Sequence, residues 1–260
     1  MRFGDAVMSM ALATGLCAGM LLVLELGRRL GTRRLARDPE GARAGLGAVE
    51  GSVFGLLGLL IAFSFGGAAA RFDHRRELIV QEANAISTAW ARLDMLPSQP
   101  RETSRDLFRR YLDSRLEAYR LMPDIAAARQ ALAKSAELQR EIWKVATVTC
   151  RTEEGRGLAM IVLPPLNEMF DIFTTRTRAV AHHTPRIVFV MLFGLSLGCS
   201  ILAGYGMASG RERSWTHMVG FAVVTAAAVY VILDLEYPRV GLIRVDAADQ
   251  VLIELRESMK

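Results

Sequence analysis

The residue types on which metal sites and disulfide frameworks depend are scarce in this sequence. Its 260 residues include three cysteines and four histidines. Cys17 and Cys199 lie inside apolar stretches, Cys150 stands alone, and no pair has C-x-x-C spacing, so the cysteines indicate neither a disulfide framework nor a zinc site. The neighbouring His182 and His183 lack a third ligand at helical spacing. We therefore expect no metal and no cofactor.

Catalytic motifs are also lacking. The chain has no glycine-rich phosphate loop, no G-x-S-x-G sequence and no H-E-x-x-H sequence. The adjacent carboxylates Glu153 and Glu154 lie in a polar stretch, where acids are ordinarily solvated. These absences predict a protein that is not an enzyme.

Apolar residues are abundant instead, and they are gathered in long blocks. They make up 52% of a chain of which 23% is charged, so the two kinds of residue must alternate in blocks. A helix that crosses a bilayer needs about 20 apolar residues in succession. Four stretches meet this requirement: Ala6–Leu26, Leu46–Ala70, Ile187–Gly210 and Ser214–Leu233. We predict four transmembrane helices and a multi-pass membrane protein.

A charged block, residues 71–186, separates the second apolar stretch from the third. Its first part spaces apolar residues four and three apart, at Ile79, Ala83, Ile86 and Trp90, as in a helix with one packed face. No proline or turn cluster precedes this pattern. One long helix is therefore expected to run from the second apolar stretch to about Pro97.

The rest of the charged block is also expected to be helical. We predict helices at Arg101–Met122 and at Ile125–Thr149, the latter with Asp124 as its N-cap, and a third that restarts after the Pro164–Pro165 pair. The predicted fold class is all-α, with four transmembrane helices and an aqueous helical block inserted between the second and third. The predicted divisions are residues 1–70 (first transmembrane pair), 71–186 (aqueous block), 187–235 (second pair) and 236–260 (C-terminal tail).

Small residues recur every three or four positions along the second apolar stretch. They are Gly47, Gly51, Gly55, Gly58, Ala62, Gly66 and Ala70. Such spacing lets helix backbones approach closely, which predicts a packing face. Another side of the same helix carries Phe54, Ile61 and Phe65, which are candidates to line a path through the membrane, because large apolar rings can gate a pore by dewetting. Lipid-facing phenylalanines are an equal alternative.

Ionisable residues lie near the ends of the apolar stretches, where they tend to mark function. They are Glu25, Glu50, Arg71, Arg75, Arg76, Asp234 and Glu236. One interpretation is a set of salt bridges that anchor helix ends, and the other is a charged vestibule at each mouth of a pathway. Four-helix topology predicts that Asp234 and Glu236 meet the arginines of residues 71–76. Glu50 lies at the arginine-rich end of its helix, which favours an anchor.

Three stretches of the sequence resemble a known family. They are GLLGLLIAFSFGGAAARFDHRRELIVQEANAISTAWARLDMLP (55–97), LPPLNEMFDIFTTRTRAVAHHTPR (163–186) and VILDLEYPRVGLIRVD (231–246). Together they resemble the bacterial bestrophin-like membrane proteins, which are named for a distant similarity to the bestrophins, a group of pentameric anion channels. The resemblance implies an oligomer whose second helices line the pore neck, with Phe54, Ile61 and Phe65 as neck candidates.

The membrane orientation has two conflicting indications. The resemblance implies that both termini and the charged block lie in the cytoplasm. The positive-inside rule instead places the arginine-rich loop 27–45 in the cytoplasm. Counted only near the helix ends, however, arginines are nearly balanced between the two sides of the membrane.

Two functions follow as hypotheses. The leading one is a homo-oligomeric anion channel of the bacterial inner membrane, pentameric by resemblance, with the second helices along the path. The alternative is a non-conducting membrane scaffold or sensor whose helical block binds a partner. The expected partners are the lipid bilayer, further copies of the chain and an inorganic anion, and no nucleic acid. A net charge of +5 suits contact with anionic lipid and does not separate the two hypotheses.

Overall fold

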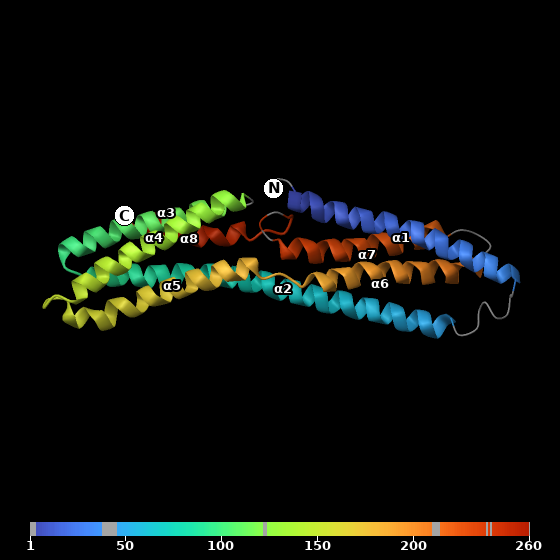
Figure 1. Ribbon diagram of the computed structural model, residues 1–260, viewed down its shortest axis with the longest axis horizontal. Coiled ribbons are helices and arrows are strands. Elements are labelled where there is room, and N and C mark those ends of the chain that lie inside the picture. Colours follow the sequence, from blue (N-terminus) through green and yellow to red (C-terminus); the bar gives the residue numbers. More distant parts are fainter. Residues whose placement is uncertain are drawn as a thin grey trace. The chain divides into compact units, whose positions relative to one another are not determined.

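The computed structural model describes residues 4–37, 46–121, 124–209, 214–237, 239 and 241–259, and every regular element in these ranges is a helix (Figure 1). The α-helices are α1 (Gly4–Arg37), α2 (Leu46–Arg92), α3 (Ser98–Arg120), α4 (Ile125–Cys150), α5 (Ala159–Ala181), α6 (Arg186–Gly206), α7 (Trp215–Glu236) and α8 (Gln250–Ser258). Short 3-10 helices occupy Leu93–Met95, Arg156–Leu158, Met207–Ser209 and Asp246–Asp249. The prediction of an all-α chain is confirmed for the described residues.

The chain forms two compact units. The first, called here the apolar unit, contains Phe3–Arg71 and Thr184–Tyr237. The second, called here the charged unit, contains Phe72–His183 and Pro238–Lys260. Helix α2 contributes its first half to the apolar unit and its second half to the charged unit. Four of the described helical stretches are long and apolar enough to cross a membrane, which is the number expected.

Several predicted helix boundaries agree with the structure. α2 continues without a break through Gly66 and Gly67 to Arg92 and passes directly into the 3-10 turn, so the expected single long helix is present. Asp124 caps α4, because its carboxylate accepts hydrogen bonds from the backbone N–H groups of Ala126 and Ala127, each at 3.2 Å. These features depend on nearby residues only, and for that reason the sequence predicts them well.

The predicted starts of α3 and α5 differ from the structure. α3 begins at Ser98, before Pro100, whereas we expected Arg101. α5 begins at Ala159 and runs through Pro164 and Pro165, whereas we expected it to begin after them. A proline removes the hydrogen bond to the carbonyl four residues earlier, which here frees the carbonyls of Met160 and Ile161. Both residues are exposed at the start of the helix. The freed carbonyls therefore lie near the exposed helix end, where losing a partner is tolerated.

The core of the apolar unit lies between α1, α6 and α7, which pack side by side (Figure 1). Its buried residues are Leu16, Met20, Ala222, Val229 and Leu233. Phenylalanines and leucines of the same helices pack around them. Three helices thus enclose one apolar core, with the first half of α2 set against it.

Glycines make the closest helix contact in the apolar unit. A Cβ on Gly27 of α1 would lie less than 3.0 Å from the carbonyl oxygen of Ile201 in α6, and one on Gly204 would lie equally close to the carbonyl oxygen of Leu24. Gly31 meets Tyr205 in the same way. The backbones of α1 and α6 approach closely because these positions lack a side chain.

The charged unit has a larger core of its own. Buried apolar residues come from the second half of α2, from α3, α4 and α5, and from the C-terminal segment that includes α8. Ile79, Ala83, Ile86 and Leu93 are all buried, which confirms the predicted packed face of α2. Leu252 of α8 is fully buried in the same cluster, so the C-terminal segment is part of the fold.

We predict that Gly204→Ala destabilises the apolar unit and that Gly198→Ala does not. A methyl group at position 204 would overlap the α1 backbone, and overpacking of this kind costs about 1–3 kcal/mol. At position 198 a Cβ meets no atom within 4 Å, and alanine favours a helix by about 1 kcal/mol over glycine. Thermal unfolding of the two variants in the same detergent measures the difference. Equal melting temperatures would contradict the close α1–α6 contact.

Candidate functional site

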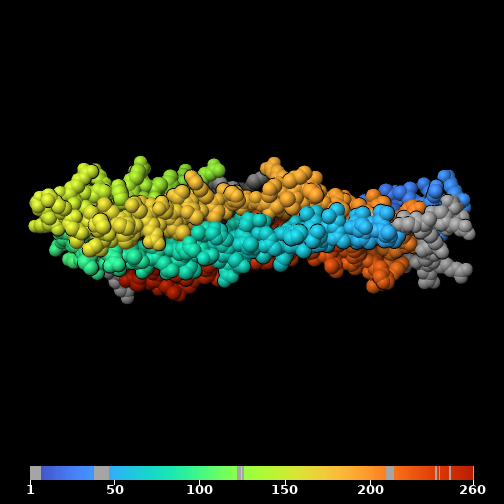
Figure 2. Space-filling model, turned by 90° about the horizontal axis from the view of Figure 1, so that it is seen from below, coloured from blue at the N-terminus to red at the C-terminus, as the bar shows by residue number. Residues whose placement is uncertain are grey.

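The apolar half of α2 is the least covered of the candidate membrane-spanning helices. Of its most apolar 18-residue stretch, 17% is buried within the chain, whereas 50% of the corresponding stretch of α7 is buried. Figure 2 shows this half, in light blue to cyan, at the surface of the molecule. A membrane-crossing helix in this state has most of its surface available to lipid or to another protein chain.

The covered side of this half-helix is narrow. It contains Leu57, Ser64 and Ala68, which are buried. Phe54 lies beside them and meets Phe221 of α7 edge to face, with ring centroids 5.7 Å apart. Ile61 is half-buried on the same side. Two of the three candidate path-lining residues, Phe54 and Ile61, are thus turned toward the chain's own helices.

The small residues of α2 lie on its uncovered side. A Cβ built on Gly47, Gly51, Gly55, Gly58 or Gly66 would meet no atom within 4 Å. Ala62 is likewise exposed. Within the described residues of the chain these positions make no close helix contact, unlike the glycines between α1 and α6. This face of α2 is therefore open within the described part of the chain.

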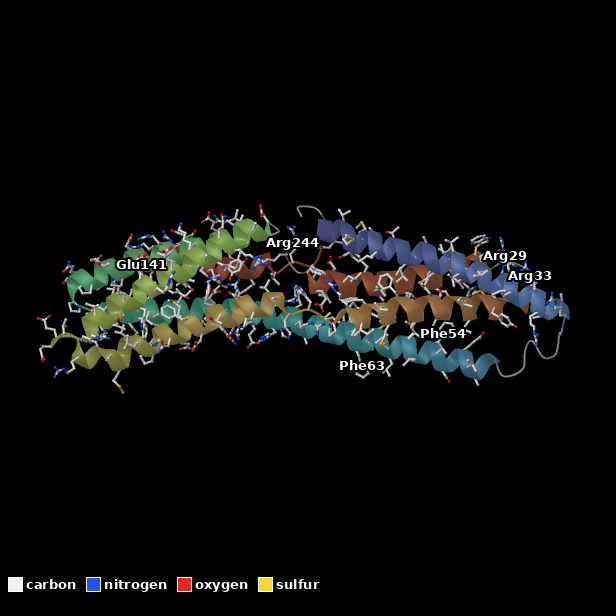
Figure 3. The ribbon with its side chains drawn as sticks, viewed as in Figure 1. Arg29, Arg33, Phe54, Phe63, Glu141 and Arg244 are labelled. Atoms are coloured by element: carbon white, nitrogen blue, oxygen red, sulfur yellow. The ribbon has the colours of Figure 1, made fainter. Side chains whose placement is uncertain are left out.

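Large apolar side chains flank the small residues on the uncovered side. Phe65, the third path-lining candidate, is 46% exposed at one edge, and Phe63 is 72% exposed at the other. Figure 3 shows Phe54 and Phe63 on opposite sides of α2. Leu56 and Leu59 lie near Phe63 and are also exposed. The free side of α2 therefore has a strip of small residues with bulky apolar residues at its edges.

At the end of the apolar half, Arg71 meets Glu236 of α7. Its Nε donates to Glu236 Oε1 at 3.0 Å, and its Nη2 donates to the same oxygen and to Thr184 Oγ1. Thr184 also donates from its hydroxyl and its backbone N–H to Glu236. Of the two acids expected to meet an arginine of residues 71–76, Glu236 is the one that pairs with Arg71. Asp234 itself is buried and accepts from Tyr230 at 3.4 Å.

The other charged candidates have separate surroundings. In the charged unit, Arg75 is buried and donates to the carbonyls of Ala179 and His182 at the end of α5. Arg76 is exposed and lies 3.7 Å from Asp73.

The two acids near the other end of the apolar unit also differ from each other. Glu25 pairs with Arg28 and Arg29 along α1. Glu50 lies against Gly206, and its buried Oε1 has no hydrogen-bond partner among the described residues.

A group of charges that the sequence did not single out lies at the centre of the charged unit. Glu82 of α2 has no exposed surface, and its carboxylate accepts from Arg115 Nε at 2.6 Å and from Arg176 Nη1. Arg115 belongs to α3 and Arg176 to α5. The ring of Tyr119 lies under the guanidinium carbons of both arginines, 5.0 Å from that of Arg115 and 3.9 Å from that of Arg176. One carboxylate thus joins three helices.

The same network extends to the C-terminal segment. Asp249 accepts from Arg176 Nη2 at 3.0 Å and from both terminal nitrogens of Arg239 at 2.8 and 3.1 Å. At the far end of the segment, Arg256 forms two hydrogen bonds to Asp113 of α3 at 2.7 and 3.0 Å. Ion pairs therefore attach residues 239–256 to the helices of the charged unit.

The arginines decide the protonation state of Glu82. Burial alone raises the pKa of a carboxyl group, but the positive charges of Arg115 and Arg176 and their hydrogen bonds outweigh it and lower the pKa of Glu82 to about 2. The Tyr119 hydroxyl loses solvation on burial, which raises its pKa to about 12. Glu82 is thus charged and Tyr119 neutral at physiological pH.

A signal for this network exists in the sequence. Glu82 falls three residues after Ile79 and four before Ile86, on the packed face of α2, where an apolar residue is expected. Arg115 similarly follows Tyr111 by four residues on the buried face of α3. A charged residue at a core position implies a buried partner, but the sequence does not show which residue supplies it. No cluster of three or more possible metal ligands occurs in the described part of the chain.

Comparisons with known proteins give a consistent result. The family described as the bestrophin-like domain matches residues 14–249. Two crystal structures of a bacterial bestrophin homologue from Klebsiella pneumoniae, one with a tyrosine and one with a tryptophan replaced by alanine, are similar in fold. Their TM-scores are 0.63 and 0.65 at 15% and 16% identity, covering 92% and 95% of this chain and 97% of each of theirs. No curated protein is significantly similar in sequence.

We predict that Glu82→Gln strongly destabilises the protein. The change leaves Arg115 and Arg176 without a counter-charge, and breaking a buried ion pair costs about 3–5 kcal/mol. Glu77→Gln is the matched control, because Glu77 lies on the same helix but is exposed. Thermal unfolding at pH 7 is the measurement. A melting temperature of Glu82→Gln equal to that of the control would show that the network does not hold the unit together.

The pH dependence should identify Glu82 as the cause. Because its folded pKa of about 2 is below the ordinary value of 4.5, its stabilising contribution is complete above about pH 4.5 and is lost as the pH falls toward 2. The difference in melting temperature between wild type and Glu82→Gln should therefore be constant from pH 7 to 5 and shrink below pH 4.5. A difference that stays constant down to pH 3 would contradict this assignment.

Proposed function

The chain belongs to the bestrophin-like family, and from that premise we propose that it forms a homo-oligomeric anion channel in the bacterial inner membrane, with α2 along the path. Copies of the chain surround a central axis, five of them by analogy with the bestrophins. The charged unit lies in the aqueous phase on one side of the membrane.

The uncovered side of α2 is the observation that supports the proposal most directly. A single copy buries 17% of the most apolar 18-residue stretch of α2 and leaves the small residues of that stretch uncovered. Membrane helices associate through such small residues because backbones approach closely there. A ring of copies would bring the uncovered sides of several α2 helices toward a common axis.

Phe65 is the residue we propose for the narrow point of the path. It is exposed at the edge of the strip of small residues, while Phe54 and Ile61 face the chain's own helices. A ring of Phe65 side chains would narrow a path whose wall otherwise consists of small residues. The same ring would close the path by excluding water. Phe54 then has a supporting role, because its contact with Phe221 sets the rotation of α2.

The choice of an anion rests on family resemblance and on arginines near both ends of the apolar unit. Glu25 at one end is shared between Arg28 and Arg29. At the other end Arg71 retains 32% exposure of its side chain while it pairs with Glu236. We propose that Arg71 and Glu236 fix the end of α2 relative to α7, and that the partly exposed Arg28 and Arg71 favour anions at the two mouths.

A second candidate function has one feature in its favour. A groove of about 740 Å³ in the charged unit runs between α3 and α4, with Gln99, Thr103, Leu107, Glu141, Lys144 and Val148 among its lining residues. Its lining combines apolar residues with charges of both signs, which suits a peptide or a helix of another protein. A membrane scaffold or sensor would use this groove and would not need conduction.

The test is anion flux through purified protein reconstituted in liposomes. We expect chloride-dependent flux from the wild type, faster flux from Phe65→Ala, and little flux from Gly55→Leu, whose leucine would project from the open side of α2. Gly15→Leu is the matched control, because Gly15 on α1 is also exposed and its Cβ would also meet no atom within 4 Å. Cross-linking in the membrane establishes the oligomeric state of each variant.

Two results would overturn the channel. One is an absence of flux from well-reconstituted, oligomeric wild type, which would favour the scaffold. The other is equal loss of flux in Gly15→Leu and Gly55→Leu, which would show that the uncovered side of α2 has no special role.

A further inference from the structure

Helix α1 is longer than a membrane requires, and its extra length is basic. At 1.5 Å per residue, its 34 residues extend about 51 Å, whereas the hydrocarbon core of a bilayer is about 30 Å thick. The apolar stretch ends at Leu26. The arginines that follow are Arg28, Arg29, Arg33, Arg34 and Arg37. The helix therefore continues for several turns beyond the apolar core with a high density of positive charge.

Leucines and arginines share the exposed face of α1. The exposed leucines are Leu22, Leu26 and Leu30. The exposed arginines are Arg29, Arg33 and Arg37. At 100° per residue, these six positions fall within an arc of about 100°. The arc lies opposite the buried side of α1, which contains Leu24 and the glycines that meet α6, and Figure 3 shows Arg29 and Arg33 near the end of the helix.

The positive charge on this face exceeds the available negative charge. Glu25 pairs with Arg28 at 3.1 Å and with Arg29 at 2.9 Å. Arg33 and Arg37 have no ion pair within the described part of the chain. The helix dipole favours cations only in the last turn, so it accounts for Arg37 and not for Arg29 or Arg33. The exposed guanidinium groups of Arg33 and Arg37 are therefore open to an anion from outside the described part of the chain.

A tryptophan marks the same end of the apolar unit. Gly31 of α1 lies against Ala208, just before the connection that leads to α7. The first residue of α7 is Trp215, which is 56% exposed. Tryptophans are enriched at the boundary between hydrocarbon and headgroups. The arginines of α1 thus lie at the level where lipid headgroups are found.

We propose that the face formed by Arg29, Arg33 and Arg37 binds the headgroups of anionic phospholipids. The leucines on the same face contact the acyl chains, and each guanidinium reaches a lipid phosphate with paired hydrogen bonds. A lipid fits better than a soluble anion because the apolar stripe leads without interruption to the charges. This inference concerns the outer surface of α1 and does not rest on conduction by the chain.

The test counts the lipids that remain bound to the protein. Detergent-solubilised full-length protein is equilibrated with equal amounts of phosphatidylcholine and phosphatidylglycerol, and the bound lipids are identified by native mass spectrometry. We expect phosphatidylglycerol to be enriched about fivefold or more over the mixture, since one basic residue near an anionic surface supplies about this factor. The variant Arg29→Gln/Arg33→Gln/Arg37→Gln should bind the two lipids nearly equally.

A matched control removes the same charge elsewhere. Arg92→Gln/Arg129→Gln/Arg140→Gln changes three exposed arginines of the charged unit and should keep the enrichment. Raising the salt from about 0.1 M to 0.5 M should weaken the enrichment in wild type, because screening shortens the reach of the charges. This last measurement does not depend on the folding of any variant. No enrichment in wild type, persistence in the α1 variant, or equal loss in the control would each overturn the proposal.

Discussion

The carboxylate of Glu82 has no exposed surface, and a charge in such a position is tolerated only when opposite charges surround it. Arg115 and Arg176 supply those charges from two other helices, and Arg176 carries the network on to Asp249. The second half of α2, α3, α5 and the C-terminal segment must therefore assemble together, because any one of them missing leaves a buried charge without its partner. The packing of these four segments against one another depends on this condition.

The apolar unit is held by a different means. Gly27, Gly31 and Gly204 let the backbones of α1 and α6 approach closely, and Phe54 attaches α2 to α7 through Phe221. On the remaining surface of its first half lie Gly47, Gly51, Gly55, Gly58 and Gly66, on which none of the described residues packs. Helix α2 therefore differs along its length, with a second half buried in an ionic and apolar core and a first half left open.

Sequence patterns predicted most of the helices, because helices depend on local information. The four apolar stretches, the continuity of α2 and the Asp124 cap all follow from spacing and residue type over a few positions. The predicted start of α5 after Pro164 and Pro165 is wrong, because the carbonyls that these prolines free lie at an exposed helix end and the helix can run through them. The position of Glu82 on an apolar stripe was visible in the sequence, although its arginine partners lie 33 and 94 residues away.

By itself the sequence determined which segments are helical, which of them are apolar enough for a bilayer, and where charges gather near their ends. The spacing of apolar and charged residues predicts these properties, because each depends on residues that are near one another in the sequence. Only the tertiary structure decided which glycines are covered, because α1 and α2 both carry small residues at the same spacing and differ only in whether another helix lies against them. It also decided that Phe54 faces inward and that Arg71 pairs with Glu236. Such contacts join residues far apart in the chain, and their geometry follows from the packing of whole helices.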